Sequence, residues 1–243
     1  MQPDIQAIFL DVGNTLRVLV KDEPHRARAR QQLALLAETQ DSPEVFVAQL
    51  DARYKVYRQW AFETMREASE KELWTRWLLP DLPAEKIAPL AGELTFQFRQ
   101  SMGRREMVRG AKSVVIELDK RGYTLGIISN VITEKEIPDW LDADGLASYF
   151  KAVMLSSVFG KRKPDPAIYW QAAQRAGVEP KYCAYVGDNP KRDVVGTYQA
   201  GFGMVVILID PAELAQEPIA AENKPDVVIH EFNKLLDIFP ARA

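Results

Sequence analysis

Asp11 occupies a position where an acidic side chain is costly unless it has a chemical use. It directly follows the apolar run of residues 8–10, which is typical of a buried strand. An ionised carboxylate without partners is expensive to bury, whereas the carboxyl ends of parallel strands are where open α/β sheets bind ligands. Asp188 ends a second apolar run, and Asp193 follows five residues later. We therefore expect an oxygen-lined metal site in which one carboxylate is free to act as a nucleophile.

The hydrophobic pattern predicts the elements that must position these acids. Six short runs rich in Val, Ile, Leu and Ala are nearly continuous rather than alternating, which is typical of strands covered on both faces. They cover residues 5–10, 123–129, 152–156, 183–187, 204–208 and 226–229. Helical patterns separate most of them, at residues 111–120, 166–176 and 192–200. This alternation predicts an α/β fold with a doubly wound parallel sheet.

Residues 17–107 interrupt the alternation of strand and helix. Apolar and aromatic side chains recur there at helical spacing, and no convincing strand is present. Examples are Phe46, Leu50, Tyr54 and Tyr57. We therefore expect a core domain formed by residues 1–16 and 108–243, with a helical cap domain of four or five helices at residues 17–107. Because the insertion leaves the sheet just after Asp11, it is placed to cover the carboxyl ends of the strands as a lid.

Composition argues against several classes of partner. The chain has 243 residues and a formal net charge of -3, which gives no reason to expect a nucleic acid or an anionic membrane as partner. No apolar run approaches the roughly 20 residues that a membrane span needs, and no signal-peptide pattern begins the chain. We expect a cytoplasmic protein, either a monomer or a homodimer. Cys183, the single cysteine, is predicted to be a buried, inert thiol.

Four short motifs occur in order, each at a predicted strand end or just beyond it. They are DVGNTL beginning at Asp11, GIISN ending in Ser129 and Asn130, KPDP beginning at Lys163, and GDNPKRD containing Asp188 and Asp193. Each motif alone can be explained structurally, as the turn that ends a strand or as the start of a helix. Together they resemble the haloacid dehalogenase (HAD) superfamily, whose members are mostly phosphatases. The resemblance implies a Rossmann-like core, and the insertion resembles the superfamily's cap in position only.

The resemblance implies a role in phosphoryl transfer for each motif. Asp11 is the implied nucleophile, forming an aspartyl-phosphate that water then hydrolyses. Mg²⁺ is the implied cofactor, with ligands from Asp11, Asp188 and the backbone carbonyl of Gly13. The implied phosphate-binding groups are the Ser129 hydroxyl, the Asn130 backbone N–H and the Lys163 ammonium. Asp193 would orient Lys163 or a metal-bound water. The expected partner is a small phosphorylated substrate.

Gly13 departs from the superfamily's pattern. Its phosphatases usually carry a second aspartate two residues after the nucleophile, which protonates the leaving oxygen and then activates water. The loss of such a general acid typically costs roughly 10²–10⁴ in rate. Three explanations are open: a substrate with a good leaving group, a proton donor from the cap such as His25, or a weakly catalytic or non-catalytic protein that binds a phosphate ligand.

Two other chemistries of the superfamily are alternatives to phosphate ester hydrolysis. A haloacid dehalogenase attacks carbon with the same aspartate and without metal. Its members usually carry an aromatic residue at the position of Gly13 and lack the Gly187-Asp188 pair, which argues against this alternative. A phosphonate-cleaving enzyme needs a cap lysine that forms a Schiff base. The available lysines, none with a local signature, are Lys21, Lys55 and Lys71. We therefore expect a Mg²⁺-dependent phosphoric monoester hydrolase.

Overall fold

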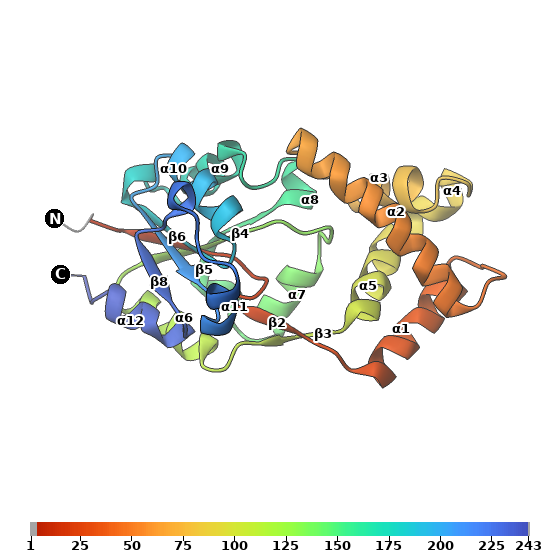
Figure 1. Cartoon of the computed structure of the whole chain (residues 1–243), viewed down its shortest axis with the longest axis horizontal. Coiled ribbons are helices and arrows are strands. Elements are labelled where there is room, and N and C mark those ends of the chain that lie inside the picture. Colours follow the sequence, from red (N-terminus) through yellow and green to blue (C-terminus); the bar gives the residue numbers. More distant parts are fainter. Residues whose placement is uncertain (1–3, 243) are drawn as a thin grey trace.

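The computed structural model describes residues 4–242 and contains a six-stranded sheet with a group of helices beside it (Figure 1). All neighbouring strands of this sheet are parallel, in the order β5-β4-β1-β6-β7-β8. The strands are β1 (Ala7–Leu10), β4 (Thr124–Ser129), β5 (Phe150–Leu155), β6 (Cys183–Gly187), β7 (Met204–Leu208) and β8 (Val227–Ile229). The predicted doubly wound parallel sheet is confirmed, and β1 lies inside it between β4 and β6.

Helices cover both faces of the sheet, which explains why its strands are apolar along their whole length. In β1, Ile8 and Leu10 pack into one hydrophobic cluster and Phe9 packs into another. Figure 1 shows α6 and α12 on one side of the strands, with α9 and α10 on the other. The bounds of these helices are Ala111–Lys120 for α6, Leu235–Ile238 for α12, Pro166–Ala176 for α9 and Val195–Gln199 for α10.

Local signals fix the position of α9 and of the residues just before it. Asp165 accepts a hydrogen bond from the Ala167 N–H at 2.9 Å, which caps the helix. Pro166 occupies the first helical position, where a backbone N–H would have no helical partner. The helix ends before Gly177, whose φ of 73° suits a glycine. α9 begins and ends at the predicted residues, and Lys163 lies three residues before its start.

The helices of the insertion have a hydrophobic core of their own. They are α1 (Glu23–Leu36), α2 (Pro43–Thr64), α3 (Glu70–Glu72), α4 (Ala84–Ile87) and α5 (Ala91–Met102), with short helical turns at Leu73–Leu78 and Ala88–Leu90. Tyr57, Trp74 and Phe98 are fully buried in this core. Figure 1 shows the group at one end of the sheet rather than on either face. Within residues 4–242, no helix is both long enough and apolar enough to cross a membrane.

The prediction that residues 17–107 contain no strand is wrong at both ends of that segment. β2 (Arg17–Val20) and β3 (Arg104–Met107) pair antiparallel, with Leu19 opposite Arg105. The two strands, RVLV and RREM, have four residues each and pair with each other across the whole insertion, so neither segment by itself indicates its partner. The two strands form the ribbon that joins the insertion to the sheet (Figure 1).

Smaller differences concern element boundaries. The strand predicted at residues 152–156 begins earlier, at Phe150. The helix predicted at residues 192–200 is divided into a π-helical turn, Pro190–Val194, and α10, Val195–Gln199. The Asn189 side chain caps the turn by accepting a hydrogen bond from the Arg192 N–H at 3.0 Å. The structure also contains helices that no prediction covers. They are α7 (Glu136–Ala143), α8 (Ser156–Phe159), α11 (Pro211–Gln216) and α12 (Leu235–Ile238).

Candidate active site

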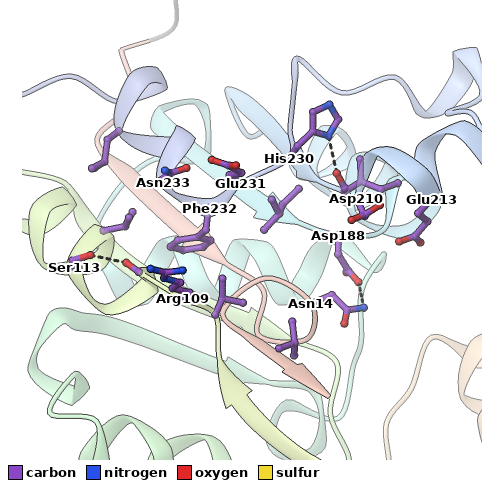
Figure 2. A pocket seen from close by; sticks show the side chains of 17 residues that line it. Asn14, Arg109, Ser113, Asp188, Asp210, Glu213, His230, Glu231, Phe232 and Asn233 are labelled. Carbon is purple, nitrogen blue, oxygen red and sulfur yellow. Dashed lines mark hydrogen bonds between the residues drawn. The ribbon is translucent and has the colours of Figure 1, made fainter. Parts of the chain in front are cut away.

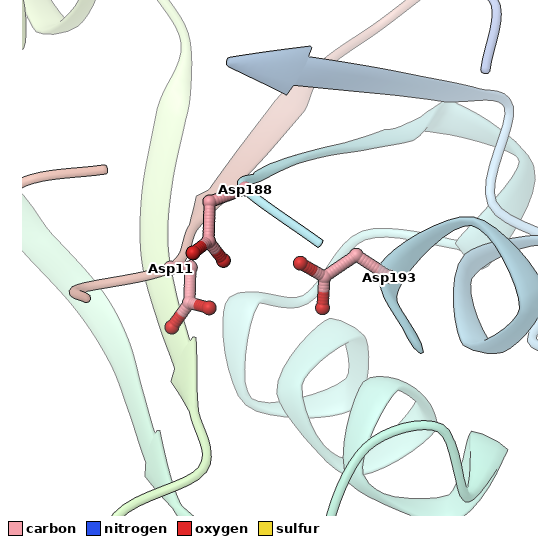
Figure 3. Close-up of side chains that lie close together, drawn as sticks. All are labelled: Asp11, Asp188 and Asp193. Atoms are coloured by element: carbon pink, nitrogen blue, oxygen red, sulfur yellow. The ribbon is translucent and has the colours of Figure 1, made fainter. Parts of the chain in front are cut away.

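The structure brings together the three aspartates that the sequence singles out. Asp11 directly follows β1, Asp188 directly follows β6, and Asp193 lies in the turn before α10 (Figure 3). One carboxylate oxygen from each lies within 4.8 Å of the others. Asp11 and Asp193 are buried, whereas Asp188 is partly exposed. We call these residues the aspartate cluster; its oxygen ligands and negative charge favour a cation.

Four hydrogen bonds hold the Asp11 carboxylate. Its Oδ1 accepts from the Val12 N–H at 2.7 Å and from the Ser129 hydroxyl at 2.9 Å. Its Oδ2 accepts from Lys163 Nζ at 2.8 Å and from Arg192 Nη2 at 2.9 Å. Two of these donors are cations, and charge-assisted hydrogen bonds of this kind are shorter and stronger than neutral ones. Asp11 is therefore held in one orientation by contacts to both of its carboxyl oxygens.

Lys163 is a fully buried cation that links two members of the aspartate cluster. Its Nζ lies 2.8 Å from Asp11 Oδ2 and 3.2 Å from Asp193 Oδ1. It also donates to the hydroxyl of Tyr185, which donates to the Ile128 carbonyl at 3.1 Å. A buried ammonium needs such partners, because an unpaired charge in the interior is strongly destabilising. The sequence does not single out Tyr185, because it lies inside an apolar run that is typical of core.

Asn130 connects the end of β4 to the segment that carries Lys163. Its side-chain oxygen accepts from the Lys163 backbone N–H at 2.8 Å, and its side-chain amide donates to the Lys163 carbonyl at 2.9 Å. Both backbone groups of Lys163 are therefore fixed by one side chain. The sequence singles out Asn130 for its backbone N–H, whereas this positioning role of its side chain becomes visible only in the structure.

Arg192 contacts all three members of the aspartate cluster, and the sequence does not single it out. Its Nη2 lies 2.9 Å from an oxygen of each member of the aspartate cluster, and its Nε lies 2.7 Å from Asp193 Oδ1. Burial opposes its charge, but Asp193 and Asp11 outweigh that effect, so the pKa of Arg192 is raised. The sequence offers one indication that Arg192 belongs to the site, which is its position directly before Asp193. The surrounding stretch is typical of an exposed helix start.

Charges in the site shift the pKa values of Asp188 and Asp193 in opposite directions. Burial, followed by the negative charge of Asp11, raises the pKa of Asp188, and Arg192 offsets part of this rise. Burial also acts to raise the pKa of Asp193, but Lys163 and Arg192 outweigh it and hold that pKa below its usual range. Asp193 therefore stays charged, while Asp188 lies in surroundings whose negative charge a further cation would relieve.

Gly13 and Asn14 form the loop that follows Asp11. Asn14 has a φ of 52°, a left-handed conformation that asparagine adopts more readily than most residues. Its amide donates to Asp188 Oδ2 at 2.9 Å (Figure 2). A Cβ atom added at Gly13 would meet no atom within 4 Å. The space that a side chain at residue 13 would fill is therefore open.

A cavity of about 300 Å³ opens over Asp11, and we call it the site cavity. The sheet domain lines it with residues that include Asp11, Gly13, Ser129, Asn130, Asp188 and Arg192. The insertion lines it with Arg17, Leu19, Arg99 and Arg105. Lys163 and Asp193 are not part of the lining and contact Asp11 or Lys163 from behind. The predicted site residues thus line one side of the site cavity or contact that side from behind. Four arginines also line the cavity.

His25 and the cap lysines lie outside the site cavity. The His25 ring contacts the Gln100 side-chain oxygen at 2.9 Å and is not part of the lining. The lysines that a Schiff-base mechanism would need do not line the site cavity either; they are Lys21, Lys55 and Lys71. Proton donation by His25, one of the three open explanations, therefore gains no support from this arrangement.

A larger cavity of about 820 Å³ lies next to the site cavity. It shares Asn14 and Asp188 with the site cavity and extends along the sheet domain to Arg109 and His230 (Figure 2). The His230 ring contacts the Ile209 carbonyl at 2.8 Å. Asp11 and Ser129 line the smaller cavity and not the larger one.

The fold is a parallel α/β sheet with the aspartate cluster at the carboxyl ends of β1 and β6. Residues 36–207 match the model of the haloacid dehalogenase-like hydrolases, which is more than half of the chain. The chain belongs to this family, and the family predicted from the four motifs is confirmed.

Relatives include proteins named for different reactions. Phosphoserine phosphatase of Thermus thermophilus is 27% identical over 98% of this chain and 100% of that protein. Phosphoglycolate phosphatase of Vibrio vulnificus is 31% identical over 65% of this chain and 68% of that protein. The chain spans about half the length of several other curated relatives. The crystal structure of a 2-haloacid dehalogenase from Pseudomonas syringae has a TM-score of 0.69 at 22% identity, covering 96% of this chain and 97% of that chain, which shows a shared fold.

Proposed function

We propose that the protein is a phosphatase that hydrolyses a small phosphate monoester through an aspartyl-phosphate on Asp11. The observation that carries the proposal is the Asp11 carboxylate, which lines the site cavity with one oxygen bound by Ser129 and the other by Lys163. An anionic nucleophile can approach an anionic phosphoryl group only where cations and donors offset the repulsion. The relatives named phosphoserine phosphatase and phosphoglycolate phosphatase support the same class of reaction.

The reaction proceeds in two displacements at phosphorus. A carboxylate oxygen of Asp11 forms a bond to phosphorus while the bond from phosphorus to the ester oxygen breaks. Water then attacks the phosphorus, which releases inorganic phosphate and restores the carboxylate. Ser129 and the backbone N–H of Asn130 donate to the phosphoryl oxygens, and Lys163 balances the negative charge. Through its side chain, Asn130 also keeps Lys163 in place.

We propose Mg²⁺ as the cofactor of this reaction. Mg²⁺ prefers oxygen ligands and takes few carboxylates; Asp11, Asp188 and the Gly13 carbonyl supply oxygens of this kind beside the site cavity. When bound, the ion neutralises charge on the phosphoryl oxygens. Asp193 orients Lys163 from behind. Arg192 lies between the same carboxylates and must turn outward to admit the ion; its side chain is 23% exposed, so it has a path to solvent.

We propose that the insertion, residues 17–107, serves as the cap of this site. It contributes three arginines to the site cavity, and its ribbon of β2 and β3 begins directly after the loop that holds Gly13. A volume of about 300 Å³ lies at the lower end of ligand pockets and restricts the substrate to a small molecule.

The departing oxygen, we propose, takes its proton from solvent. Gly13 provides no acid, and His25 lies outside the site cavity. Turnover should then depend steeply on the pKa of the leaving group, because a weakly basic oxygen needs little protonation. Acyl and aryl phosphates should be hydrolysed much faster than alkyl phosphates.

The test is phosphate release from a panel of acyl, aryl and alkyl phosphates, with and without Mg²⁺, by the wild type and by Asp11→Asn. Mg²⁺-dependent release that the variant lacks is the expected result. Release that survives in Asp11→Asn would remove the aspartyl-phosphate mechanism. Absence of release from every compound, with tight phosphate binding, would assign a binding protein instead. Halide release without metal would assign a dehalogenase.

A further inference from the structure

Arg105 is a cation without a carboxylate partner in a cavity whose other arginines are paired. The pairs are Arg17 with Asp144, Arg99 with Glu136 and Arg192 with the aspartate cluster. Within residues 4–242, no carboxylate oxygen lies within 4.0 Å of the Arg105 guanidinium. The site cavity therefore contains one positive charge that the protein does not balance locally.

Strand β3 turns Arg105 toward the site cavity and its neighbours toward solvent. Side chains alternate along a strand, and Arg104 and Glu106 are exposed whereas Arg105 is half-buried. The guanidinium uses its Nη1 to donate to the Arg99 carbonyl at 3.0 Å. A guanidinium has five N–H donors, so most of those on Arg105 have no protein acceptor in the part of the chain described. They lie at the lining of the site cavity, where a ligand can reach them.

The unbalanced charge is energetically costly. Burial, followed by repulsion from Arg99, lowers the pKa of Arg105 to about 10, although the negative charge of Glu136 opposes this change. The side chain still carries its proton at neutral pH, so the folded protein retains a partly desolvated positive charge. A partly desolvated charge is stabilised only when an opposite charge lies close to it. Within residues 4–242 no carboxylate lies against the guanidinium, and a ligand in the site cavity can supply one.

We propose that Arg105 binds a carboxylate of the substrate, on the insertion side of the site cavity, while the phosphoryl group lies at Asp11. This inference rests on the proposed phosphatase function. A planar guanidinium can hold a carboxylate by two parallel hydrogen bonds. The volume of about 300 Å³ admits both anionic groups only if a short chain joins them. The substrate is thus a short-chain phosphate monoester that carries a carboxylate.

Binding of two phosphonates that cannot be hydrolysed separates the two anionic groups. The ligands are 3-phosphonopropionate and propylphosphonate, which differ in the carboxylate, and isothermal titration with Mg²⁺ present gives both dissociation constants. We expect the wild type to bind 3-phosphonopropionate roughly 10- to 100-fold more tightly, the range for a hydrogen-bonded charged group. In Arg105→Gln the ratio of the two dissociation constants should fall toward one. Arg105→Lys should give an intermediate ratio, because lysine keeps the positive charge but lacks the planar pair of N–H donors.

Arg104→Gln is the matched control, because it removes the same charge from the neighbouring position. Arg104 pairs with Asp22 and Glu106 at the surface, so its loss should leave the ratio of the wild type intact. Circular dichroism establishes that each variant is folded, and Arg105→Lys carries the test if Arg105→Gln is not.

Each result separates this inference from the proposed phosphatase function. Equal binding of the two phosphonates by the wild type would overturn the carboxylate site and leave the phosphoryl site intact. Equal weakening of both ligands in Arg105→Gln would place Arg105 at the phosphoryl group instead. Tighter binding of propane-1,3-bisphosphonate than of 3-phosphonopropionate would replace the carboxylate by a second phosphoryl group. If the wild type bound neither phosphonate, the proposed function itself would fail.

Discussion

Restoring an acid at residue 13 tests whether Gly13 limits the rate. A Cβ atom at this position meets nothing within 4 Å, so Gly13→Asp should fold without a steric penalty. The new carboxyl group would enter the site cavity that Gly13 lines, where a general acid must lie to reach the departing oxygen.

The expected gain depends on the leaving group. For an alkyl phosphate, whose departing oxygen needs a proton, Gly13→Asp should raise kcat by roughly 100-fold, the lower end of what general acids contribute, or about 2.7 kcal/mol in the barrier. For an aryl phosphate such as p-nitrophenyl phosphate, the gain should be small. Phosphate release at saturating substrate gives both rates, and their dependence on leaving-group pKa should become shallower in the variant.

Gly13→Asn is the matched control, because it has nearly the same shape and cannot donate a carboxyl proton. If Asn and Asp raised the alkyl phosphate rate equally, the gain would come from shape or backbone restriction rather than from acid catalysis. If neither variant changed the rate, the absence of an acid at residue 13 would not be what limits turnover, and the proposal of solvent protonation would be refuted.

Three further predictions follow from the same site and core. Asp11→Asn should abolish phosphate release while circular dichroism stays that of the wild type, because the amide keeps the shape and loses the nucleophile. Arg192→Gln should tighten Mg²⁺ binding by roughly tenfold or more in isothermal titration, because a cation that contacts the same carboxylates is removed. Cys183 should not react with a disulfide reagent at pH 8, since burial raises the pKa of its thiol to about 12 and leaves almost no thiolate.

Each of these predictions has a result that contradicts it. Full activity in Asp11→Asn would exclude the proposed chemistry. Lys163→Met tests whether turnover also needs the positive charge beside Asp11, and full activity in that variant would likewise exclude the proposed chemistry. Weaker or unchanged Mg²⁺ binding in Arg192→Gln would show that the guanidinium does not compete with the ion; Lys191→Gln, a neighbouring surface charge paired with Glu217, is its control. Cys183 should react fully once guanidinium chloride unfolds the protein, and rapid reaction before unfolding would show that the thiol is accessible.

Local patterns in the sequence predict much of the sheet domain. The bounds of α6 and α9 are those that the helical periodicity and caps predict, and β6 and β7 begin and end at the predicted residues. These elements are encoded locally: a short apolar run bounded by turn residues is typical of an interior strand, and a capping residue or a glycine marks where a helix begins or ends. Since the strands are parallel, their acidic carboxyl ends meet at one edge, so the meeting of Asp11 and Asp188 also follows from the sequence.

Contacts between distant segments decide the rest. No local pattern pairs β2 with β3, because each finds its partner at the other end of the insertion. Arg192 looks like a surface residue until the turn after β6 directs its guanidinium between the carboxylates. Tyr185 looks like core until the Lys163 ammonium meets its hydroxyl. The sequence by itself determines which groups can do chemistry and at which edge of the sheet they lie. Only the tertiary structure decides which charges are balanced and which, like that of Arg105, are left for a ligand, because charge balance depends on distances between residues far apart in the chain.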